Sequence, residues 1–430
     1  MKDKADNVNT KTEKTADRAG TPYHVTIAGA GLNGLTLALA LKQALGSAIG
    51  ITVADPALNR DPMLDKRSFA VTPASRRMFE TLDVWDDDGL QSEPVIDMVI
   101  TDSRLDDPVR PVLLTFAEGN LRSEPLAHMV ENGRLTAALM AACRATDIHF
   151  IDSAIESYVP SATGVDITIP GHPAIHSALL VAADGKRSRL RDLAGIAWIA
   201  WSYKQSGIVG TIAHEFDHEG KAYEHFLPSG PFAILPLMPG GTLGNRSSIV
   251  WTETTDTADY LLELDQDDQL AELDRRFGPT LGKIALETRL QGFPLSFGIA
   301  RSFVADRLAL LGDAAHAIHP IAGQGLNLGL EDVAALAEII TDAVRIGLDP
   351  GSYNQLELYE KARRFDVTSK GLAMDGLNRL FSNDITPVRL LRDFGLGVVN
   401  RLPELKRFFV DRATGNGDTE APRLLRGEIL

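Results

Sequence analysis

Cysteine is nearly absent from this sequence of 430 residues, in which Cys143 stands alone. One cysteine excludes an intrachain disulfide, a CxxC redox centre and a cysteine-rich metal site. The sequence also lacks an uninterrupted apolar run of about 18 residues, the length that predicts a transmembrane helix. Positive charge is in deficit, and the formal net charge of -15 argues against a nucleic-acid partner because phosphate groups would be repelled.

The N-terminal stretch, residues 1–22, is polar and has no apolar segment of the kind found in secretory signals, so we expect a disordered tail. Hydrophobic residues make up 44% and charged residues 23% of the chain, proportions typical of a globular protein. The length predicts two or three domains. The composition as a whole favours a cytoplasmic protein.

A glycine-rich turn follows the first apolar strand-like run, residues 24–28. The order of strand, glycine turn and helix is the context of a dinucleotide-binding fingerprint. Gly29 allows the tight turn, Gly31 lets the backbone approach a pyrophosphate, and Gly34 lets the helix pack closely on the strand. A second strand ends at Asp55, about 20 residues further on, where a carboxylate binds ribose hydroxyls. The pattern predicts a dinucleotide site, for which NAD and FAD both remain candidates.

Two later strands also end in a glycine–acid pair. An apolar run at residues 177–183 leads into Asp184 and Gly185, and another at residues 308–311 leads into Gly312 and Asp313. Further glycines at positions 323 and 325 open a helix expected to reach about residue 343. Free N–H groups at such a turn favour an anionic ligand. The basic run at residues 186–191 has two interpretations, a solvated turn or a site that attracts a phosphorylated reductant.

Residues 197–297 show a different pattern, in which short strands alternate with turns. This pattern predicts an antiparallel sheet with one buried face, interrupted by one amphipathic helix at residues 258–277. The proline-stiffened run at residues 230–237 has two open interpretations, the wall of an apolar substrate pocket or a sheet core with an edge proline. After Asp332 the chain is expected to be mostly helical.

Three glycine–acid motifs thus stand in order, GAGLNG from Gly29, DG at Asp184 and GD at Gly312. This series resembles the class A flavoprotein monooxygenases, which are FAD-dependent aromatic hydroxylases. More narrowly, it resembles the ubiquinone-biosynthesis hydroxylases that act on polyprenylated phenols. The resemblance runs from Tyr23 to about Gly415, and its blocks are GDAAHAIHPIAGQGLNLGLEDV, DKRSFAVTPASRRMFETLDVW, ENGRLTAAL, GPFAILPL and GLNRLFSN.

The resemblance implies an α/β fold with a Rossmann-like FAD-binding domain, an interleaved antiparallel-sheet substrate domain and C-terminal helices. The FAD-binding domain is expected to be discontinuous. The implied boundaries are 23–94, 117–196 and 298–345 for the FAD-binding domain, 95–116 and 197–297 for the substrate domain, and 346–430 for the C-terminal helical region.

The resemblance also implies roles for residues of the first motif. Gly29, Gly31 and Gly34 would hold the pyrophosphate of FAD. Asp55 would bind the adenosine ribose, at a position where the family more often has glutamate. Arg67 would lie near the phosphates of the cofactor.

For the rest of the cofactor, the resemblance implies contacts from the later motifs. Asn132 stands where many relatives carry an arginine that contacts FAD. Asp184 and Gly185 belong to a motif linked to both FAD and NAD(P)H. Asp313, after Gly312, would bind the ribityl chain. Pro320 would lie against the flavin ring. The backbone N–H groups at its pyrimidine edge would come from Gly323, Gln324, Gly325, Leu326 and Asn327.

The implied activity is hydroxylation of an electron-rich phenol with NAD(P)H as transient reductant and O₂ as oxidant. The sequence names no acid or base, and the candidates near the substrate or flavin are His316, Pro320 and Tyr223. His316 and His319 also invite a metal interpretation, but no carboxylate or cysteine cluster accompanies them, so local hydrogen bonds or contact with the flavin site are favoured. For Tyr223 and His225, a role on the face of a sheet competes with contact to a phenolic oxygen.

Other functions remain open from the sequence. They are a flavin-dependent reductase or dehydrogenase on the same fold, a non-catalytic flavin-binding subunit of a biosynthetic complex, and a plain NAD dehydrogenase. Residues 377–409 mix apolar and basic side chains. They are expected either to meet the inner face of a membrane or a partner protein, or to pack on the protein's own domains.

Overall fold

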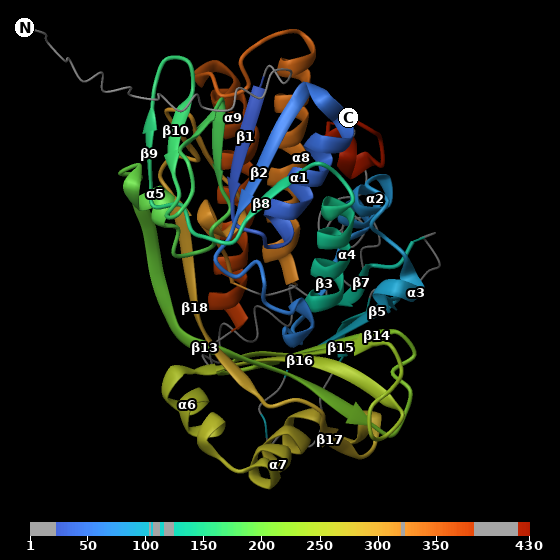
Figure 1. The fold of residues 1–430 in the computed structure, drawn as a ribbon. Helices are drawn as coiled ribbons and strands as arrows, with labels where there is room; N and C mark the ends of the chain where they lie inside the picture. Colours follow the sequence, from blue (N-terminus) through green and yellow to red (C-terminus); the bar gives the residue numbers. More distant parts are fainter. Residues whose placement is uncertain (1–22, 103–104, 106–111, 116–123, 320–322, 382–419) are drawn as a thin grey trace, which may run out of the picture.

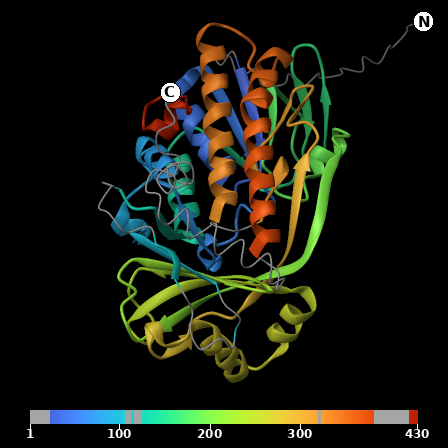
Figure 2. The same cartoon turned by 180° about the vertical axis from the view of Figure 1, so that it is seen from behind.

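The computed structural model describes residues 23–102, 105, 112–115, 124–319, 323–381 and 420–430. The expected tail at residues 1–22 lies outside this part of the chain, as does Pro320. Figures 1 and 2 show a parallel sheet with helices at one end of the molecule and a large, mostly antiparallel sheet at the other. The mixed α/β fold expected from the sequence is confirmed.

The parallel sheet has six strands, and every neighbouring pair except β19–β20 is parallel. Its central strands are apolar and buried along most of their length, as strands covered on both faces should be. In spatial order they are β19 (Val304–Ala305), β20 (Leu308–Leu310), β12 (Leu179–Ala182), β1 (Tyr23–Ala28), β2 (Ile49–Ala54) and β8 (His149–Ile151).

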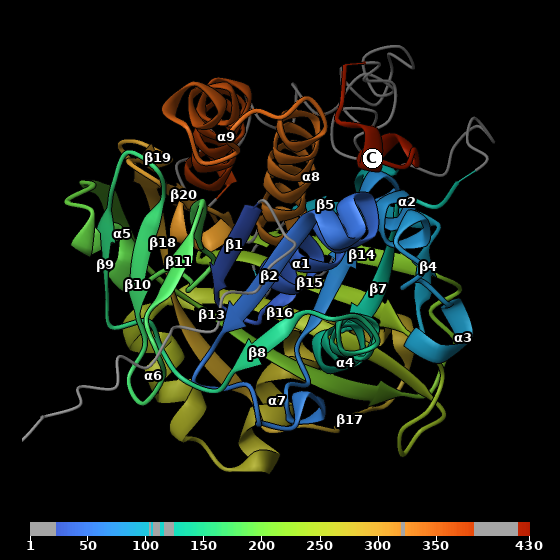
Figure 3. The same ribbon diagram turned by 45° about the horizontal axis from the view of Figure 1, so that its top comes forward.

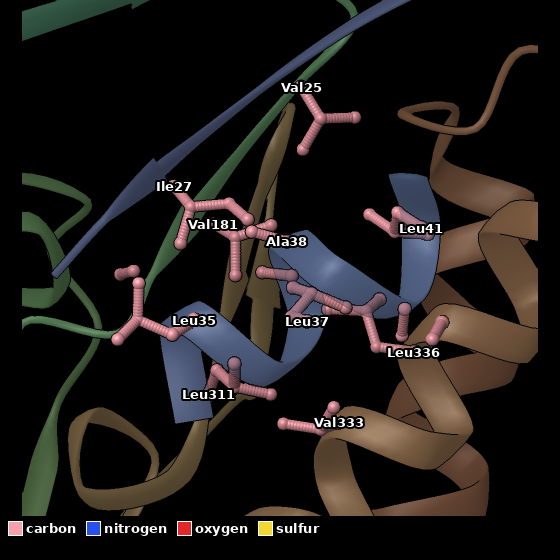
Figure 4. Packing of buried hydrophobic residues seen from close by; sticks show 14 of the residues in the cluster. Val25, Ile27, Leu35, Leu37, Ala38, Leu41, Val181, Leu311, Val333 and Leu336 are labelled. Atoms are coloured by element: carbon pink, nitrogen blue, oxygen red, sulfur yellow. The ribbon is translucent and has the colours of Figure 1, made fainter. Parts of the chain in front are cut away.

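Helix α1 (Leu32–Leu45) lies between this sheet and helix α8 (Gln324–Arg345). Its leucine and alanine side chains are buried on nearly all sides, because the strands cover one flank and other helices cover the rest. Figure 4 shows Leu35 and Ala38 of α1 near Ile27 of β1, and Leu41 towards α8. The other helices of this part are α2 (Pro73–Thr81), α3 (Asp87–Leu90), α4 (Asn132–Arg144) and α5 (Arg189–Leu193).

The second large sheet has nine strands and is antiparallel except where β14 pairs with β5. Two of its strands, β13 and β18, are long and extend from beside the parallel sheet into this nine-stranded sheet (Figure 1). The strands are β21 (His316–Ala317), β18 (Gln291–Ala300), β13 (Trp198–His214), β16 (Asn245–Thr254), β15 (Gly230–Leu237), β14 (Lys221–Leu227), β5 (Asp97–Asp102), β6 (Val112–Thr115) and β17 (Ile284–Leu286).

Both faces of the nine-stranded sheet are covered, and this corrects the expectation of a single buried face. Ile249 and Trp251 point into a core formed with two helices, α6 (Thr255–Glu263) and α7 (Gln266–Phe277). The opposite face is turned towards the parallel-sheet part (Figures 1 and 2). The single helix expected at residues 258–277 was also wrong, because Asp265 caps a new helix by accepting the N–H of Asp268.

The run at residues 230–237 forms β15, which lies between β14 and β16 rather than at a sheet edge. Two small sheets complete the fold (Figure 3). They comprise β3 (Ser68–Val71), β7 (Ala127–Glu131) and β4 (Glu93–Val95) in one, and β11 (Ile175–Ser177), β10 (Val165–Thr168) and β9 (Ser157–Pro160) in the other.

The chain returns to the parallel-sheet part at its C-terminal end. Helix α9 (Tyr353–Phe381) packs beside α8 (Figure 3), and the final segment docks through Arg423, which pairs with Glu338 of α8 at 2.9 Å. Most of residues 377–409 lie outside the described part. No helix that the structure describes combines the length and apolar character needed to cross a membrane.

Candidate functional site

The three glycine–acid motifs lie at one edge of the parallel sheet. Gly29 follows β1, Asp55 follows β2, Asp184 follows β12 by two residues, and Gly312 follows β20 by two residues. These four strands are neighbours and run in the same direction. Their carboxyl ends therefore meet, in the place where open α/β sheets bind ligands.

The first glycine turn has the geometry that its sequence predicts. Gly29 has φ +112°, and a methyl group there would overlap the carbonyl oxygen of Ala183, which directly follows the neighbouring strand β12. A methyl group at Gly34 would overlap the carbonyl oxygen of Gly29, so helix and strand touch without room for a side chain. At Gly31, by contrast, no atom lies within 4 Å of an added Cβ. No side chain caps helix α1 at Gly31, which leaves its first N–H groups for an anion.

Asp55 holds the first turn in place from the end of β2. Its carboxylate accepts the N–H of Ala30, inside the glycine turn, at 2.7 Å, and the N–H of Ala57 at 2.6 Å. The side chain is partly exposed. An anchored carboxylate at this position is oriented for hydroxyl donors, which fits the ribose role expected of it.

At the second motif, a buried arginine joins two of the strand ends. Arg191 donates to the carbonyl oxygens of Lys186 and Ala314, both at 3.1 Å, and lies 4.1 Å from the ring centroid of Trp198. It is only 4% exposed, so this member of the basic run is neither solvated nor free for a reductant. One carboxylate oxygen of Asp184 is buried without a hydrogen-bond partner. Such an orphan acceptor suits a hydroxyl or amide donor of a ligand.

The third motif is fitted tightly against the first. Gly312 has φ +57°, and a methyl group there or at Gly329 would overlap the side-chain amide of Asn33 from the GAGLNG turn. Asp313 keeps an exposed surface, yet protein surrounds it closely enough that desolvation raises its pKa. Nearby His316, Lys186 and Arg67 partly offset that rise. The Asp313 carboxyl is therefore closely surrounded by protein but still accessible to solvent, as a group that lines a ligand site must be.

A buried ion network fixes the position of the third motif. Asp332 of α8 accepts the N–H of Gly312 at 3.1 Å, pairs with Nε2 of His316 at 2.6 Å and with Arg363 of α9 at 2.7 Å. Burial alone would raise the pKa of Asp332, but His316 and Arg363 hold it below its usual value. His316 therefore forms a local hydrogen bond. Within the described residues no three His, Cys, Asp or Glu side chains group as metal ligands.

Helix α8 starts beside this network with a second open glycine turn. Gly323 has φ +63°, and an added Cβ would lie 3.1 Å from Ala70 of β3. No atom lies within 4 Å of an added Cβ at Gly325, and no side chain caps the helix. Gln324 and Leu326 are partly buried.

Asn327 anchors the turn rather than facing a ligand with its side chain. Its oxygen accepts from the Thr72 N–H at 3.0 Å and from Ser75 Oγ at 2.9 Å. Its amide group donates to the carbonyl oxygens of Ala70 and Gly323.

Asp65 brings together two of the residues expected to contact FAD, Arg67 and Asn132. It accepts a bidentate pair from Arg67, at 2.6 Å for the closest contact, and the side-chain amide of Asn132, also at 2.6 Å. The Arg67 guanidinium lies 5.7 Å from the ring centroid of Phe293 on β18. Arg67 thus reaches from the parallel-sheet part to the nine-stranded sheet while staying half exposed.

The catalytic candidate Tyr223 packs with the core next to α6 and α7, on the face turned away from the parallel-sheet part. His225 shares that face and bonds Thr101. The sequence drew attention to these two residues and passed over Glu224 between them. The sequence also did not reveal the structural roles of Asn33 and Arg191, because their contacts come from segments distant in the chain.

Converging parallel strands, two uncapped glycine turns and a ribose-type carboxylate define a dinucleotide-binding α/β protein. The chain belongs to the FAD-binding domain family, whose model matches residues 22–367. It is 42% identical to ubiquinone hydroxylase UbiL of Rhodospirillum rubrum over 94% of this chain and 93% of that protein. It is 32% identical to 3-demethoxyubiquinol 3-hydroxylase of Escherichia coli, over 92% and 99%.

In fold it matches p-nitrophenol 4-monooxygenase of Pseudomonas putida, with a TM-score of 0.72 and 17% identity over 92% of this chain and 98% of that one. The family and the relatives identify the chain as an FAD-dependent monooxygenase. The residues present fit FAD, because the two glycine turns are open where the cofactor's anionic groups would lie and the Asp184 oxygen lacks a protein donor.

Proposed function

We propose that this enzyme hydroxylates the aromatic ring of a ubiquinone precursor, a phenol with a polyprenyl tail, using NAD(P)H and O₂. Bound FAD, once reduced, supplies the activation of O₂ and the transfer of one oxygen atom to the ring. NAD(P)H provides the two electrons, and the second oxygen atom leaves as water. The names of the two curated relatives support the substrate class.

The convergence of three motifs at one sheet edge carries the proposal. We infer that Gly29, Gly31 and Gly34 hold the pyrophosphate and that Asp55 binds the ribose. Asp184 and Gly185 would contribute from the second motif. The N–H groups of residues 323–327 would stabilise negative charge at the flavin's pyrimidine edge by up to about 2 kcal/mol. Asp313 would bind the ribityl chain.

The chain's other tasks are orientation and exclusion of water. We infer that residues 23–94, 117–196 and 298–345 form the FAD-binding domain and that residues 95–116 and 197–297 form the substrate domain. On the sheet face turned to the cofactor side, Leu235 is apolar and only partly buried, which suits contact with a lipophilic phenol. A tail of isoprene units would further suit contact with a membrane surface or a biosynthetic complex.

Oxygen-isotope labelling tests the activity. The purified chain would be incubated with a short-tailed polyprenylphenol, NADH or NADPH, and ¹⁸O₂, and the product analysed by mass spectrometry. We expect a mass gain of one ¹⁸O atom per product ring, dependent on FAD. Oxidised or reduced substrate without label would instead establish a dehydrogenase or reductase.

A further inference from the structure

The nine-stranded sheet contains a buried carboxyl group, that of Glu224, to which no hydrogen bond or ion pair within the described part of the chain assigns a structural role. Glu224 of β14 is 8% exposed, and its carboxylate has no hydrogen-bond or ion-pair partner among the residues that the structure describes. Glutamate is rarely so buried without a partner, since burial removes much of the hydration that stabilises its charge. The other buried carboxylates of this sheet behave differently. Glu253, for example, pairs with Arg276.

Glu224 lies on the face turned to the cofactor side. Successive residues of a strand point to opposite faces, and its neighbours Tyr223 and His225 point to the α6–α7 side. Ala222, two residues earlier and roughly 7 Å away along the strand, packs in a small core with Ala70 partly buried against it. Ala70 in turn lies against Gly323, where α8 begins. The carboxylate is therefore one strand repeat from a small core whose member Ala70 borders the proposed flavin turn.

The neighbours of Glu224 within the sheet on this face are apolar. Ile100 of β5 and Ala233 of β15 are directly opposite it, and Val250 of β16 follows Ala233. The charged group nearest in register is Asp102, one repeat further along β5. Desolvation is the cause that raises the pKa of Glu224, to about 7. A group of this kind exchanges a proton near neutral pH, as a general base must.

We propose that Glu224 binds the phenolic hydroxyl of the aromatic substrate and takes its proton during hydroxylation. This role rests on the proposed function. The O–H bond of the phenol breaks, its electron pair stays on the phenolate oxygen, and the proton forms an O–H bond with the Glu224 carboxylate. No oxidation or reduction occurs in this step. The added electron density activates the ring carbon that receives oxygen, and the proton returns to the product's oxygen afterwards.

The test compares three variants of the full-length, FAD-loaded chain. Glu224→Gln keeps the shape and removes the base, and Glu224→Asp keeps a carboxylate. Glu219→Gln makes the same chemical change at an exposed site five residues earlier. Product formation with a short-tailed polyprenylphenol, total NAD(P)H oxidation and FAD content are measured between pH 5.5 and 9.

In the wild type and in Glu219→Gln, we expect kcat/KM for hydroxylation to rise with pH through about 7, since the base must be ionised. In Glu224→Gln, kcat/KM for hydroxylation should fall by about 100-fold or more at pH 8 and should no longer increase with pH, while FAD binds normally. Glu224→Asp should regain the rise at a reduced rate. Unchanged hydroxylation and pH profile in Glu224→Gln would overturn the inference, whereas failure of the wild type to hydroxylate any phenol would instead overturn the proposed function.

Discussion

Substituting alanine separately for two glycines of the same turn should have opposite consequences. At Gly31 the added methyl group meets no protein atom within 4 Å, and the backbone, at φ -77°, suits any residue. Alanine is a weaker helix N-cap than glycine by less than about 1 kcal/mol, so the apo protein should keep nearly its full stability. The methyl group would instead occupy space intended for the cofactor's pyrophosphate.

The expected loss of FAD affinity follows from the contacts that the methyl group displaces. A hydrogen bond from a backbone N–H to a charged group contributes about 1.5–3 kcal/mol, so losing one weakens FAD binding by about 10–150-fold. Gly34→Ala should show the reverse order of effects. Its methyl group would overlap the carbonyl oxygen of Gly29, and such overpacking destabilises the folded chain by about 1–3 kcal/mol or more.

Two measurements on each variant separate these effects. Denaturant unfolding of the apo protein gives the stability, and quenching of FAD fluorescence on titration gives the dissociation constant. We expect Gly31→Ala to change mainly the second quantity and Gly34→Ala the first. If Gly31→Ala bound FAD as tightly as the wild type, the placement of the pyrophosphate at this turn would be refuted.

Three further variants probe the groups around the site. Asp332→Asn removes the fully buried carboxylate from Arg363, which keeps its pairs with Glu331 and Asp366, and should destabilise the chain by about 1.5–3 kcal/mol in urea unfolding; no change would contradict the pairing seen here. Asn327→Ala leaves the N–H of Thr72 without its acceptor and should destabilise the folded chain by about 1–3 kcal/mol in urea unfolding. It should also weaken FAD binding in the fluorescence titration. Because the folded pKa of Glu224, about 7, lies above its ordinary 4.5, ionisation destabilises the fold. Glu224→Gln should therefore match the wild type at pH 4.5 and exceed its stability by about 3 kcal/mol above pH 8, and equal stabilities at both pH values would contradict this.

Local sequence determined the parts of the site that depend on backbone shape. Two glycines of the first turn could be predicted to have structural roles because only glycine fits there. Gly29 has a positive φ, and Gly34 lies too close to the backbone of the turn for a side chain. The ends of the strands were equally readable, since an apolar run stopping at an acid marks where a buried strand meets solvent. Parallel order then brought the three motifs to one edge, as the βαβ pattern predicts.

Features built from distant segments were not predictable in this way. Asp332 and Arg363 belong to two helices, and nothing near either residue indicates that they pair with each other or that Asp332 accepts the N–H of Gly312. The division of residues 258–277 into two helices depended on a single cap at Asp265, a choice that amphipathic spacing alone does not reveal. Glu224 was passed over because alternation does not say which face of a sheet meets the cofactor.

Amide hydrogen exchange with and without FAD tests whether the three motifs bind one cofactor, since protection reports which backbone segments a ligand orders. The full-length apo protein would be compared with the FAD-loaded form by mass spectrometry. We expect new protection in three separate segments, near residues 29–35, near residues 183–190, and near residues 312–319 together with 323–327. Protection confined to the first segment, or none on addition of FAD, would contradict the convergence of the three motifs on one cofactor.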